Sequence, residues 1–226
     1  MRTSPATWRA AALAHLPHGE LSATLEEGDL GQWVEAAMGC GIAQAQIRLG
    51  HMLLAGDGIR PDARAAFACF LCAAKSGDAD GHAMLGHCLE NGQGTEKDPP
   101  AAIRHYRRAA ALGHAGAMNF LGRCLEAGIG MKADKFLARA WYRRSARGGD
   151  FRGAYNYATM IAAEGCIAGA LHWFGRALLG APEPNRGDMV TALSSHKISA
   201  MRALAAHAHE RGLHGDNEIG LTPAGP

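Results

Sequence analysis

Two cysteines separated by two residues, Cys69 and Cys72, are the first pair in this sequence whose spacing could support chemistry. A C-x-x-C pair can act as a redox centre or a zinc half-site when one thiol lies at the start of a helix, where the helix dipole lowers its pKa. Cys69, however, lies well beyond Asp62, the residue that we expect to begin the helix. The pattern therefore favours packing over redox or zinc chemistry.

A second cluster combines hydroxyls and imidazoles near the C-terminus. Ser194, Ser195 and His196 are adjacent, but nucleophilic catalysis requires a base and an orienting acid that are brought together in space, which neighbours in sequence do not provide. In the stretch HAHERGLH, His207 and His214 could share a helical face, yet the Gly-rich surroundings favour an exposed helix end. We therefore predict no catalytic residue, no metal site and no cofactor, and hence a protein that is not an enzyme.

The composition indicates helices packed closely together. The 226 residues are 48% hydrophobic but only 6% aromatic, so alanine and leucine form most of the core, which is typical of an all-α chain. A net charge of +2 is too small to require nucleic acid or an anionic membrane as partner. No apolar run approaches the roughly 18 to 20 residues that span a bilayer, and no secretory signal is evident. We expect a cytoplasmic protein with reduced cysteines and no membrane insertion.

The dipeptide Leu-Gly returns with a constant spacing of 36 residues, at Leu49-Gly50, Leu85-Gly86 and Leu121-Gly122. A period of this length is the signature of a solenoid built from helical repeats. The same shift relates further glycines, aspartates, alanines and aromatic residues, which include Gly56, Gly92 and Gly128; Gly58, Gly94 and Gly130; Asp62, Asp98 and Asp134; and Phe70, Tyr106 and Tyr142.

Each repeated position has a physical task in a helix-turn-helix unit. Gly50 lowers helix propensity by about 1 kcal/mol relative to alanine, which is tolerable where a neighbouring helix leaves no room for a side chain. Gly56 and Gly58 suit a turn that needs positive φ, Asp62 can accept hydrogen bonds from the first amides of the second helix, and Gly77 can end that helix. We therefore expect one helix over 43–55 and a second that begins after Asp62.

The stretch LGHCLENGQGTEKDPPAAIRHYRRAAALGH closely resembles the Sel1-like repeat family, which is related to the tetratricopeptide class. The resemblance implies an all-α fold, a right-handed α/α solenoid superhelix of helix-turn-helix repeats. It covers three complete repeats and a fourth from which four residues of the inter-helix turn are missing. The expected organisation is a cap with a degenerate half repeat at 1–42, repeats at 43–78, 79–114 and 115–150, a truncated repeat at 151–182, a capping helix within 183–212 and a tail at 213–226.

A groove lined by the first helix of each repeat is the best candidate site, because the tetratricopeptide class binds peptides or partner domains on this concave face. The positions expected to project into it are Gln44, Ile47, Arg48, His51, Asp80, Ala83, His87, Asn119, Arg123 and Glu126. Within this set, His51, His87 and Arg123 occupy equivalent positions, and such a row could bind an acidic peptide or a terminal carboxylate. A groove that contacts only solvent is the alternative interpretation.

The leading hypothesis is thus a non-enzymatic adaptor or scaffold that binds a protein or peptide, in a bacterial assembly, signalling or secretion pathway. One alternative is a ligand-binding protein or hydrolase like the disulfide-rich Sel1-like proteins that bind β-lactam compounds, although the cysteines here lack the paired arrangement of that group. Another is an RNA-binding solenoid, because Arg108, Arg144 and Arg176 recur on the second helices, but we consider nucleic acid disfavoured. The oligomeric state stays open.

Overall fold

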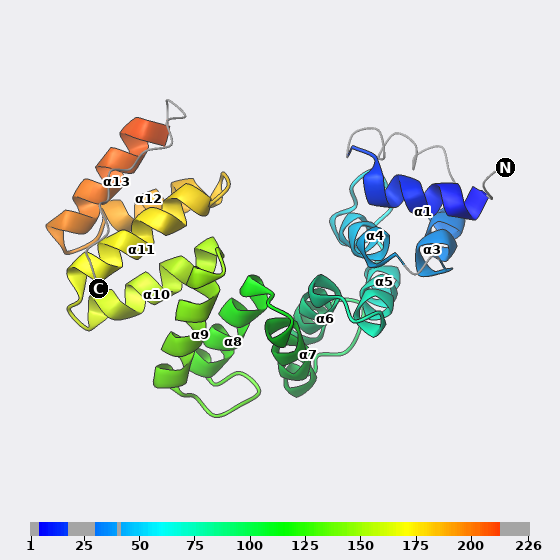
Figure 1. Ribbon diagram of the computed structural model, residues 1–226, viewed down its shortest axis with the longest axis horizontal. Coiled ribbons are helices and arrows are strands. Elements are labelled where there is room, and N and C mark those ends of the chain that lie inside the picture. Colours follow the sequence, from blue (N-terminus) through cyan, green and yellow to red (C-terminus); the bar gives the residue numbers. More distant parts are fainter. Residues whose placement is uncertain (1–4, 18–29, 40–41, 213–226) are drawn as a thin grey trace. The chain divides into compact units, whose positions relative to one another are not determined.

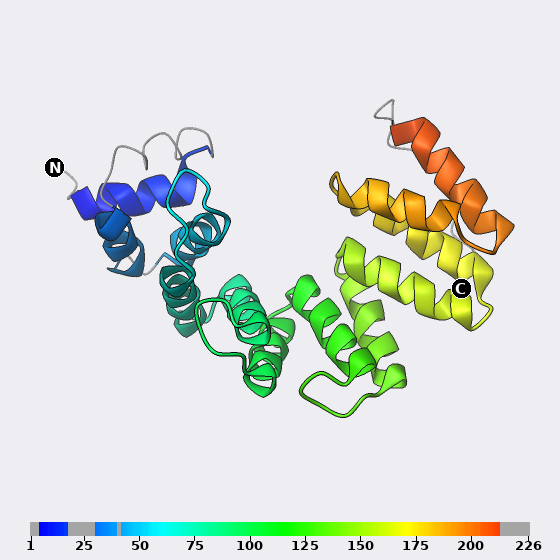
Figure 2. The same cartoon turned by 180° about the vertical axis from the view of Figure 1, so that it is seen from behind.

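The computed structural model describes residues 5–17, 30–39 and 42–212, and every element within these ranges is an α-helix (Figures 1 and 2). This confirms the expected all-α fold. The chain divides into two compact units, which we describe separately. The first unit contains residues 1–117 and 128–132, and the second contains 118–127 and 133–226.

Consecutive helices form pairs that follow the 36-residue period. The pairs are α4 (Ala43–Ala55) with α5 (Ala63–Lys75), α6 (Ala79–Asn91) with α7 (Pro99–Ala111), α8 (Ala115–Ala127) with α9 (Lys135–Arg147), and α10 (Phe151–Ala163) with α11 (Ile167–Gly180). The first helix begins and ends where the sequence predicts it, at Ala43 and Ala55. Ala and Leu side chains on the facing sides of each pair form the core, as the periodicity indicates.

The glycine of each Leu-Gly dipeptide permits close contact between the two helices of a repeat. A Cβ atom added at Gly50 would lie 2.5 Å from the Phe70 ring, and one added at Gly86 would lie 2.7 Å from the ring of Tyr106. Both rings are completely buried. Glycine lowers the helix propensity at these positions, but it allows an aromatic side chain to pack directly against the backbone of the neighbouring helix.

Aspartate side chains begin the second helix of each complete repeat. Oδ1 of Asp62 accepts hydrogen bonds from the amides of Arg64 and Ala65, both at 3.0 Å. The carboxylates of Asp98 and Asp134 do the same for α7 and α9, each over 2.9 Å. These contacts satisfy amides that have no partner within the helix, as the sequence predicts.

Removal of one of these caps should lower stability by a modest amount. Asp98→Ala is expected to reduce the free energy of unfolding by about 1 kcal/mol, because the amide of Ala101 loses its acceptor. Urea unfolding followed by circular dichroism measures the change. Glu96→Ala removes an exposed charge from the same turn without removing a cap, so an equal loss in both variants would contradict the capping role.

The fourth repeat has the tighter connection that its missing residues predict. Only residues 164–166 separate α10 from α11, and Cys166 takes the position of the N-cap without a hydrogen bond from its side chain. Beyond it, Phe174 and Leu178 of α11 pack with Leu193 and Met201 in one core cluster of the second unit.

The C-terminal capping region corrects one expectation. The periodicity from Asp188 to Arg211 predicts a single helix, but the structure has two, α12 (Asn185–Ser194) and α13 (Ser199–Gly212). Hydroxyl groups of Ser194 and Ser195 donate to carbonyls of the preceding turn, and Nδ1 of His196 accepts from the amide of Ile198. Such local hydrogen bonds compete with helix continuation and explain the break.

The N-terminal end carries α1 (Pro5–His15) and α3 (Leu30–Gly39). Trp33 and Ala37 of α3 are buried in the core of the first unit, as expected for the second helix of a degenerate repeat. Residues 18–29 and 40–41 of the expected N-terminal cap and the expected tail at 213–226 lie outside the described residues. Within the described part of the chain, no helix is both long and apolar enough to cross a membrane.

Candidate functional site

The predicted groove residues of the first unit differ in their access to a partner. Gln44 and Asp80 are exposed, and His87 is half-buried. Ile47 and Ala83, in contrast, are only 4% and 3% exposed. These two side chains are buried and do not project into a groove.

Arg48 acts within the chain. Its Nη1 atom donates hydrogen bonds to the carbonyl oxygens of Leu13 and Leu16, at the C-terminal end of α1. Cations are favourable at this end of a helix, where carbonyl groups have no partner in the helix. In this structure Arg48 therefore holds the N-terminal cap against α4.

His51 is exposed, although its imidazole also contacts the core. Its ring meets the Phe70 ring edge to face, with centroids 5.5 Å apart. Burial lowers the pKa of His51, and the nearby His87 lowers it further, although Asp80 raises it in part. The lowered pKa of His51 favours its neutral form, so His51 contributes less positive charge than the row His51, His87 and Arg123 suggests.

A pair of histidines elsewhere in the first unit predicts a pH dependence of stability. Nδ1 of His82 and Nδ1 of His105 are 3.1 Å apart, a contact that requires one neutral imidazole as acceptor. Burial lowers both pKa values; Arg108 lowers that of His82 further, and His82 and Arg104 lower that of His105, while Asp78 raises that of His82. Folding therefore favours the neutral forms.

Because these pKa values are lowered on folding, their contribution is complete above the unfolded value of 6.5 and is lost as the pH falls below it. We expect urea unfolding to give a lower free energy at pH 5 than at pH 7.5. His82→Gln combined with His105→Gln should reduce this difference. An unchanged difference in the double variant would contradict the assignment to this pair.

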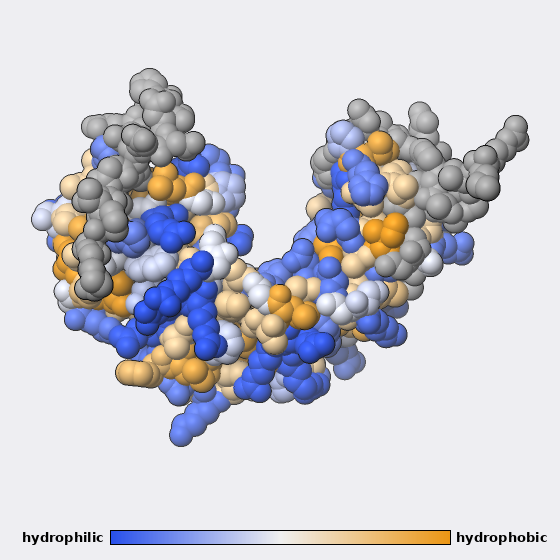
Figure 3. All heavy atoms as spheres, in the orientation of Figure 1, coloured by the Kyte–Doolittle hydropathy of each residue, from blue (hydrophilic) through white to orange (hydrophobic). Residues whose placement is uncertain are grey.

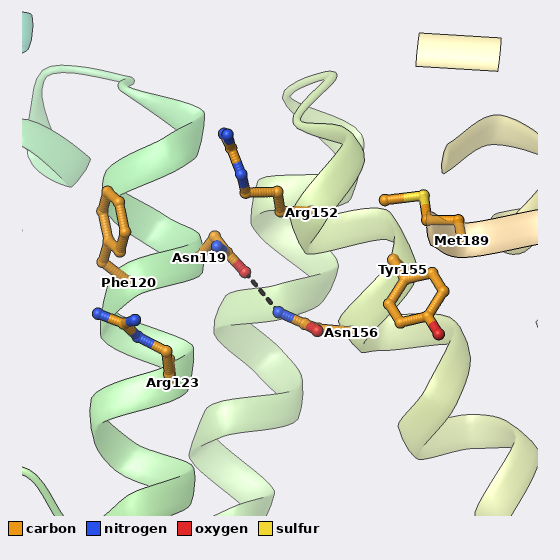
Figure 4. A pocket seen from close by; sticks show the side chains of 7 residues that line it. All are labelled: Asn119, Phe120, Arg123, Arg152, Tyr155, Asn156 and Met189. Atoms are coloured by element: carbon orange, nitrogen blue, oxygen red, sulfur yellow. Dashed lines mark hydrogen bonds between the residues drawn. The ribbon is translucent and has the colours of Figure 1, made fainter. Parts of the chain in front are cut away.

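The second unit presents a hollow of about 310 Å³ between α8, α10 and α12, which we call the cationic hollow (Figure 4). Two guanidinium groups flank it, and no acidic residue belongs to its lining. The lining residues are Asn119, Phe120 and Arg123 of α8; Arg152, Tyr155 and Asn156 of α10; and Met189 of α12. The hollow thus combines positive charge with an aromatic and aliphatic floor, an arrangement suited to an anionic group attached to apolar atoms.

Two asparagine side chains join the helices at the base of this hollow. Nδ2 of Asn156 donates to Oδ1 of Asn119 over 2.9 Å (Figure 4). Asn119 is only 5% exposed. A buried amide is costly without a partner, so this bond fixes the distance between α8 and α10. The bond occupies the Oδ1 atom of Asn119 and the Nδ2 atom of Asn156.

Both arginines are oriented by aromatic rings. The guanidinium carbon of Arg123 lies 5.3 Å from the centroid of the Phe120 ring, and that of Arg152 lies 4.5 Å from the Phe151 ring. Arginine stacks well on aromatic faces, and its planar fork still reaches carboxylates. The rings therefore reduce the number of positions that these guanidinium groups adopt.

A further hollow of about 340 Å³ lies where α8 and α10 end and α9 begins, and its lining includes the charged residues Glu126, Lys135, Arg139 and Glu164. Glu126 forms one edge, and its Oε2 accepts a hydrogen bond of 2.8 Å from the hydroxyl of Tyr142. Phe136, which is 79% exposed, and Met160 supply apolar surface. On the face drawn in Figure 3, hydrophobic side chains form small separate patches among hydrophilic ones.

The predicted residues Asn119, Arg123 and Glu126 therefore line hollows of the second unit, whereas Arg152 and Tyr155 are additional residues that the sequence interpretation missed. The repeat period could have identified both residues. Arg152 and Tyr155 lie two periods of 36 residues after Asp80 and Ala83, which were included in the predicted groove. The departure of the fourth repeat from the pattern concealed this equivalence.

The surroundings of Cys69 and Cys72 do not support a redox or zinc function for this pair. Cys69 is fully buried, and burial, together with a smaller effect of Cys72, raises its pKa to about 12. Both are free thiols. Among the described residues, no group of three or more His, Cys, Asp or Glu side chains could hold a metal ion. The thiol of Cys69 thus behaves as a packing group.

Comparison with protein families finds three consecutive matches to the model described as Sel1 repeat, over residues 43–78, 79–114 and 115–150. None of the curated proteins matches the chain. The matched ranges follow the period that the Leu-Gly dipeptides mark.

Solved structures with the same fold come from bacteria. A Sel1 repeat protein from Oxalobacter formigenes has 24% identity and a TM-score of 0.62, covering 74% of this chain and 70% of its own. A protective antigen of uropathogenic Escherichia coli with an SLR fold has 21% identity and a TM-score of 0.60, covering 92% of this chain and 49% of its own. An immunity protein from Pseudomonas aeruginosa has 17% identity and a TM-score of 0.57, covering 94% and 83%. At these identities the similarity describes the fold.

Proposed function

We propose that this chain, whose residues 43–150 match three Sel1 repeats, is a non-enzymatic adaptor that binds a partner protein along the helices α8 and α10. Sel1 repeat solenoids typically mediate protein–protein interaction. The observation that carries the proposal is the cationic hollow, where Arg123 and Arg152 lie beside the apolar surface of Phe120, Tyr155 and Met189. The bacterial neighbours and the free thiols favour a cytoplasmic role in a bacterial assembly, signalling or secretion pathway.

The make-up of the hollow favours binding over catalysis. Its lining has arginine and asparagine side chains but no Ser, Cys, Lys or carboxylate that could act as nucleophile or base. The serines near His196 donate to backbone carbonyls instead of to that imidazole. The site therefore offers recognition of charge and shape.

RNA is a second candidate partner, and one observation on the second helix of the third repeat, α9, favours it. The helix α9 has the sequence KFLARAWYRRSAR, which is rich in cations and contains no acid, and Arg144 lies 5.1 Å from the Trp141 ring centroid. Stacked aromatics among cations can bind single strands. Binding to RNA that falls steeply as salt rises would support this alternative.

The adaptor proposal is tested by a matched pair of double variants. Arg123→Ala with Arg152→Ala removes two charges at the cationic hollow, and Arg143→Ala with Arg147→Ala removes two exposed charges from α9. Proteins captured from the native host are quantified by mass spectrometry with wild type and both variants. We expect the first variant to capture about tenfold less of a specific partner and the second to retain it.

Equal capture by both variants would place the interface elsewhere and overturn the proposal. Loss in the α9 variant alone, combined with nuclease sensitivity, would favour the RNA alternative. Circular dichroism spectra that match the wild type ensure that each variant is folded.

A further inference from the structure

The helix α9 exposes apolar and cationic side chains on one side. The opposite side of α9 is buried, and the helix packs against α10 (Figure 1). Because about 3.6 residues complete a turn, the exposed side chains lie within about one third of the helix circumference. We call them the α9 face, which consists of Phe136, Leu137 and Ala140 in the first half of the helix and Arg143, Arg144 and Arg147 in the second half.

Exposed large apolar side chains are concentrated on this helix. Phe136 is 79% exposed and Leu137 is 46% exposed. Five large hydrophobic side chains are exposed within the described ranges, and α9 is the only helix there that has two of them. A contact that removes this surface from water is favourable, and apolar surface bordered by charge is typical of an interaction site.

The same helix concentrates positive charge. It contains five of the 23 lysine and arginine residues of the chain and none of the 21 acids. Arg139 forms an ion pair with Glu164. Among the described residues, no acid forms an ion pair with Arg143, Arg144 or Arg147, and all three are exposed. The overall net charge of +2 thus includes a local excess of cations that are available to an anionic partner.

This combination fits the surface of an anionic bilayer. Lipid phosphates attract arginine at the level of the headgroups, and the boundary of the acyl chains accepts aromatic and aliphatic side chains. Thirteen residues of helix extend about 20 Å, so both halves of the α9 face meet a flat surface at the same time.

RNA fits the α9 face less well. Bases stack on aromatic rings and on guanidinium groups, so RNA could use Phe136 and the arginines. The aliphatic side chains of Leu137 and Ala140 offer no such stacking, whereas the acyl boundary of a bilayer accepts them. The apolar half of the face therefore favours lipid.

We propose that the α9 face docks on an anionic phospholipid bilayer, with Phe136 and Leu137 at the boundary of the acyl chains and the arginines on lipid phosphates. The contact is peripheral, because no helix of the described residues is long and apolar enough to cross a membrane. The cationic hollow has no α9 residue in its lining, so a partner protein bound there and a bilayer use different side chains. This inference goes beyond the adaptor function and does not depend on it.

Vesicle sedimentation tests the inference with the full-length protein. The probes are sucrose-loaded vesicles of phosphatidylcholine alone, or of phosphatidylcholine with about 30% phosphatidylglycerol, at about 0.1 M salt. We expect binding to the anionic vesicles to be at least about tenfold tighter than to the neutral ones. Most of this difference should disappear at about 0.5 M salt, because salt screens the attraction between arginine and phosphate.

One pair of variants tests the apolar half of the face. Phe136→Ser combined with Leu137→Ser should weaken binding to anionic vesicles by about tenfold, because the side chains at the acyl boundary are lost. Leu179→Ser is the control, since Leu179 of α11 is 50% exposed but lies outside the face. This control should bind as the wild type does.

A second pair tests the cationic half. Arg143→Gln combined with Arg147→Gln should weaken binding to anionic vesicles by at least about fivefold. Arg104→Gln combined with Arg107→Gln removes two exposed arginines from α7 and should leave the affinity unchanged. Circular dichroism spectra that match the wild type show that the variants are folded.

Equal binding to neutral and anionic vesicles, or no binding to either, overturns the inference. Wild-type affinity in both face variants would equally reject it. Loss of affinity in the arginine variant alone would leave electrostatic attraction without the apolar contact and would reject the assigned role of Phe136 and Leu137. A fluorescein-labelled uridine oligonucleotide distinguishes the alternative, because binding to it without binding to vesicles would assign the α9 face to RNA.

Discussion

Replacing Gly94 by alanine is expected to destabilise the first unit by about 3 kcal/mol or more. Gly94 has φ 72°, a conformation that costs an L-residue about 1 to 2 kcal/mol. A Cβ atom there would also lie 2.0 Å from the carbonyl oxygen of Ala63 and 2.5 Å from its carbonyl carbon. Because these are backbone atoms at the start of α5, no change of rotamer relieves the clash, and the two repeats must separate locally.

The control for this prediction is Gly77→Ala. Gly77 has a similar φ of 82°, but a Cβ atom there would meet nothing within 4 Å. Its substitution therefore measures the conformational cost alone, about 1 to 2 kcal/mol. Urea unfolding of both variants gives the two losses, and equal losses would show that the contact with α5 is unimportant.

The contact at Gly94 shows that the inter-helix turn also joins one repeat to the preceding one. A Cβ atom at Gly130 would likewise lie 3.0 Å from the backbone carbon of Pro99, the first residue of α7. In a solenoid, the stability depends on such contacts between neighbouring repeats. At Gly94 and Gly130 the second glycine of the turn is thus required for stacking as well as for its positive φ.

The period of 36 residues was sufficient to predict the helices of the complete repeats, because each repeated residue has a local physical role. A glycine where two helices come close together and an aspartate before a helix could be predicted from the sequence alone, whereas the aromatic ring that meets the glycine became evident only in the structure. The break between α12 and α13 was not, because hydrophobic periodicity runs through it while hydroxyl and imidazole hydrogen bonds end the helix. Local polar competition of this kind leaves no periodic signal.

The candidate site was predicted in part. Asn119 and Arg123 line the cationic hollow, as members of the predicted set, but Ile47 and Ala83 are buried. A helical position at the edge of a stripe faces the core or solvent according to the packing of its neighbours, which the sequence period does not determine. Met189 could not be predicted, because it belongs to α12 outside the repeats and reaches the hollow only through the fold.

Tyr142→Ala is expected to lower the free energy of unfolding of the second unit by about 3 to 5 kcal/mol. The ring is 1% exposed, and a Cβ atom at Gly122 would lie 2.6 Å from it, so its removal leaves a cavity that the neighbouring helix cannot fill without moving. Tyr142→Phe retains the ring and loses only the hydrogen bond to Glu126, at a cost of about 1 kcal/mol. Urea unfolding of both variants, together with wild type, measures the difference.

The same pair of variants separates the packing of the Tyr142 ring from the hydrogen bond of its hydroxyl. Burial, and then the bond to Glu126, raise the pKa of Tyr142 above its usual value, so the hydroxyl remains a donor at neutral pH. In Tyr142→Phe the carboxylate of Glu126 loses this donor, whereas the ring that lies against Gly122 stays in place. Equal losses of stability in Tyr142→Phe and Tyr142→Ala would show that the hydroxyl, and not the packing of the ring, stabilises the repeat.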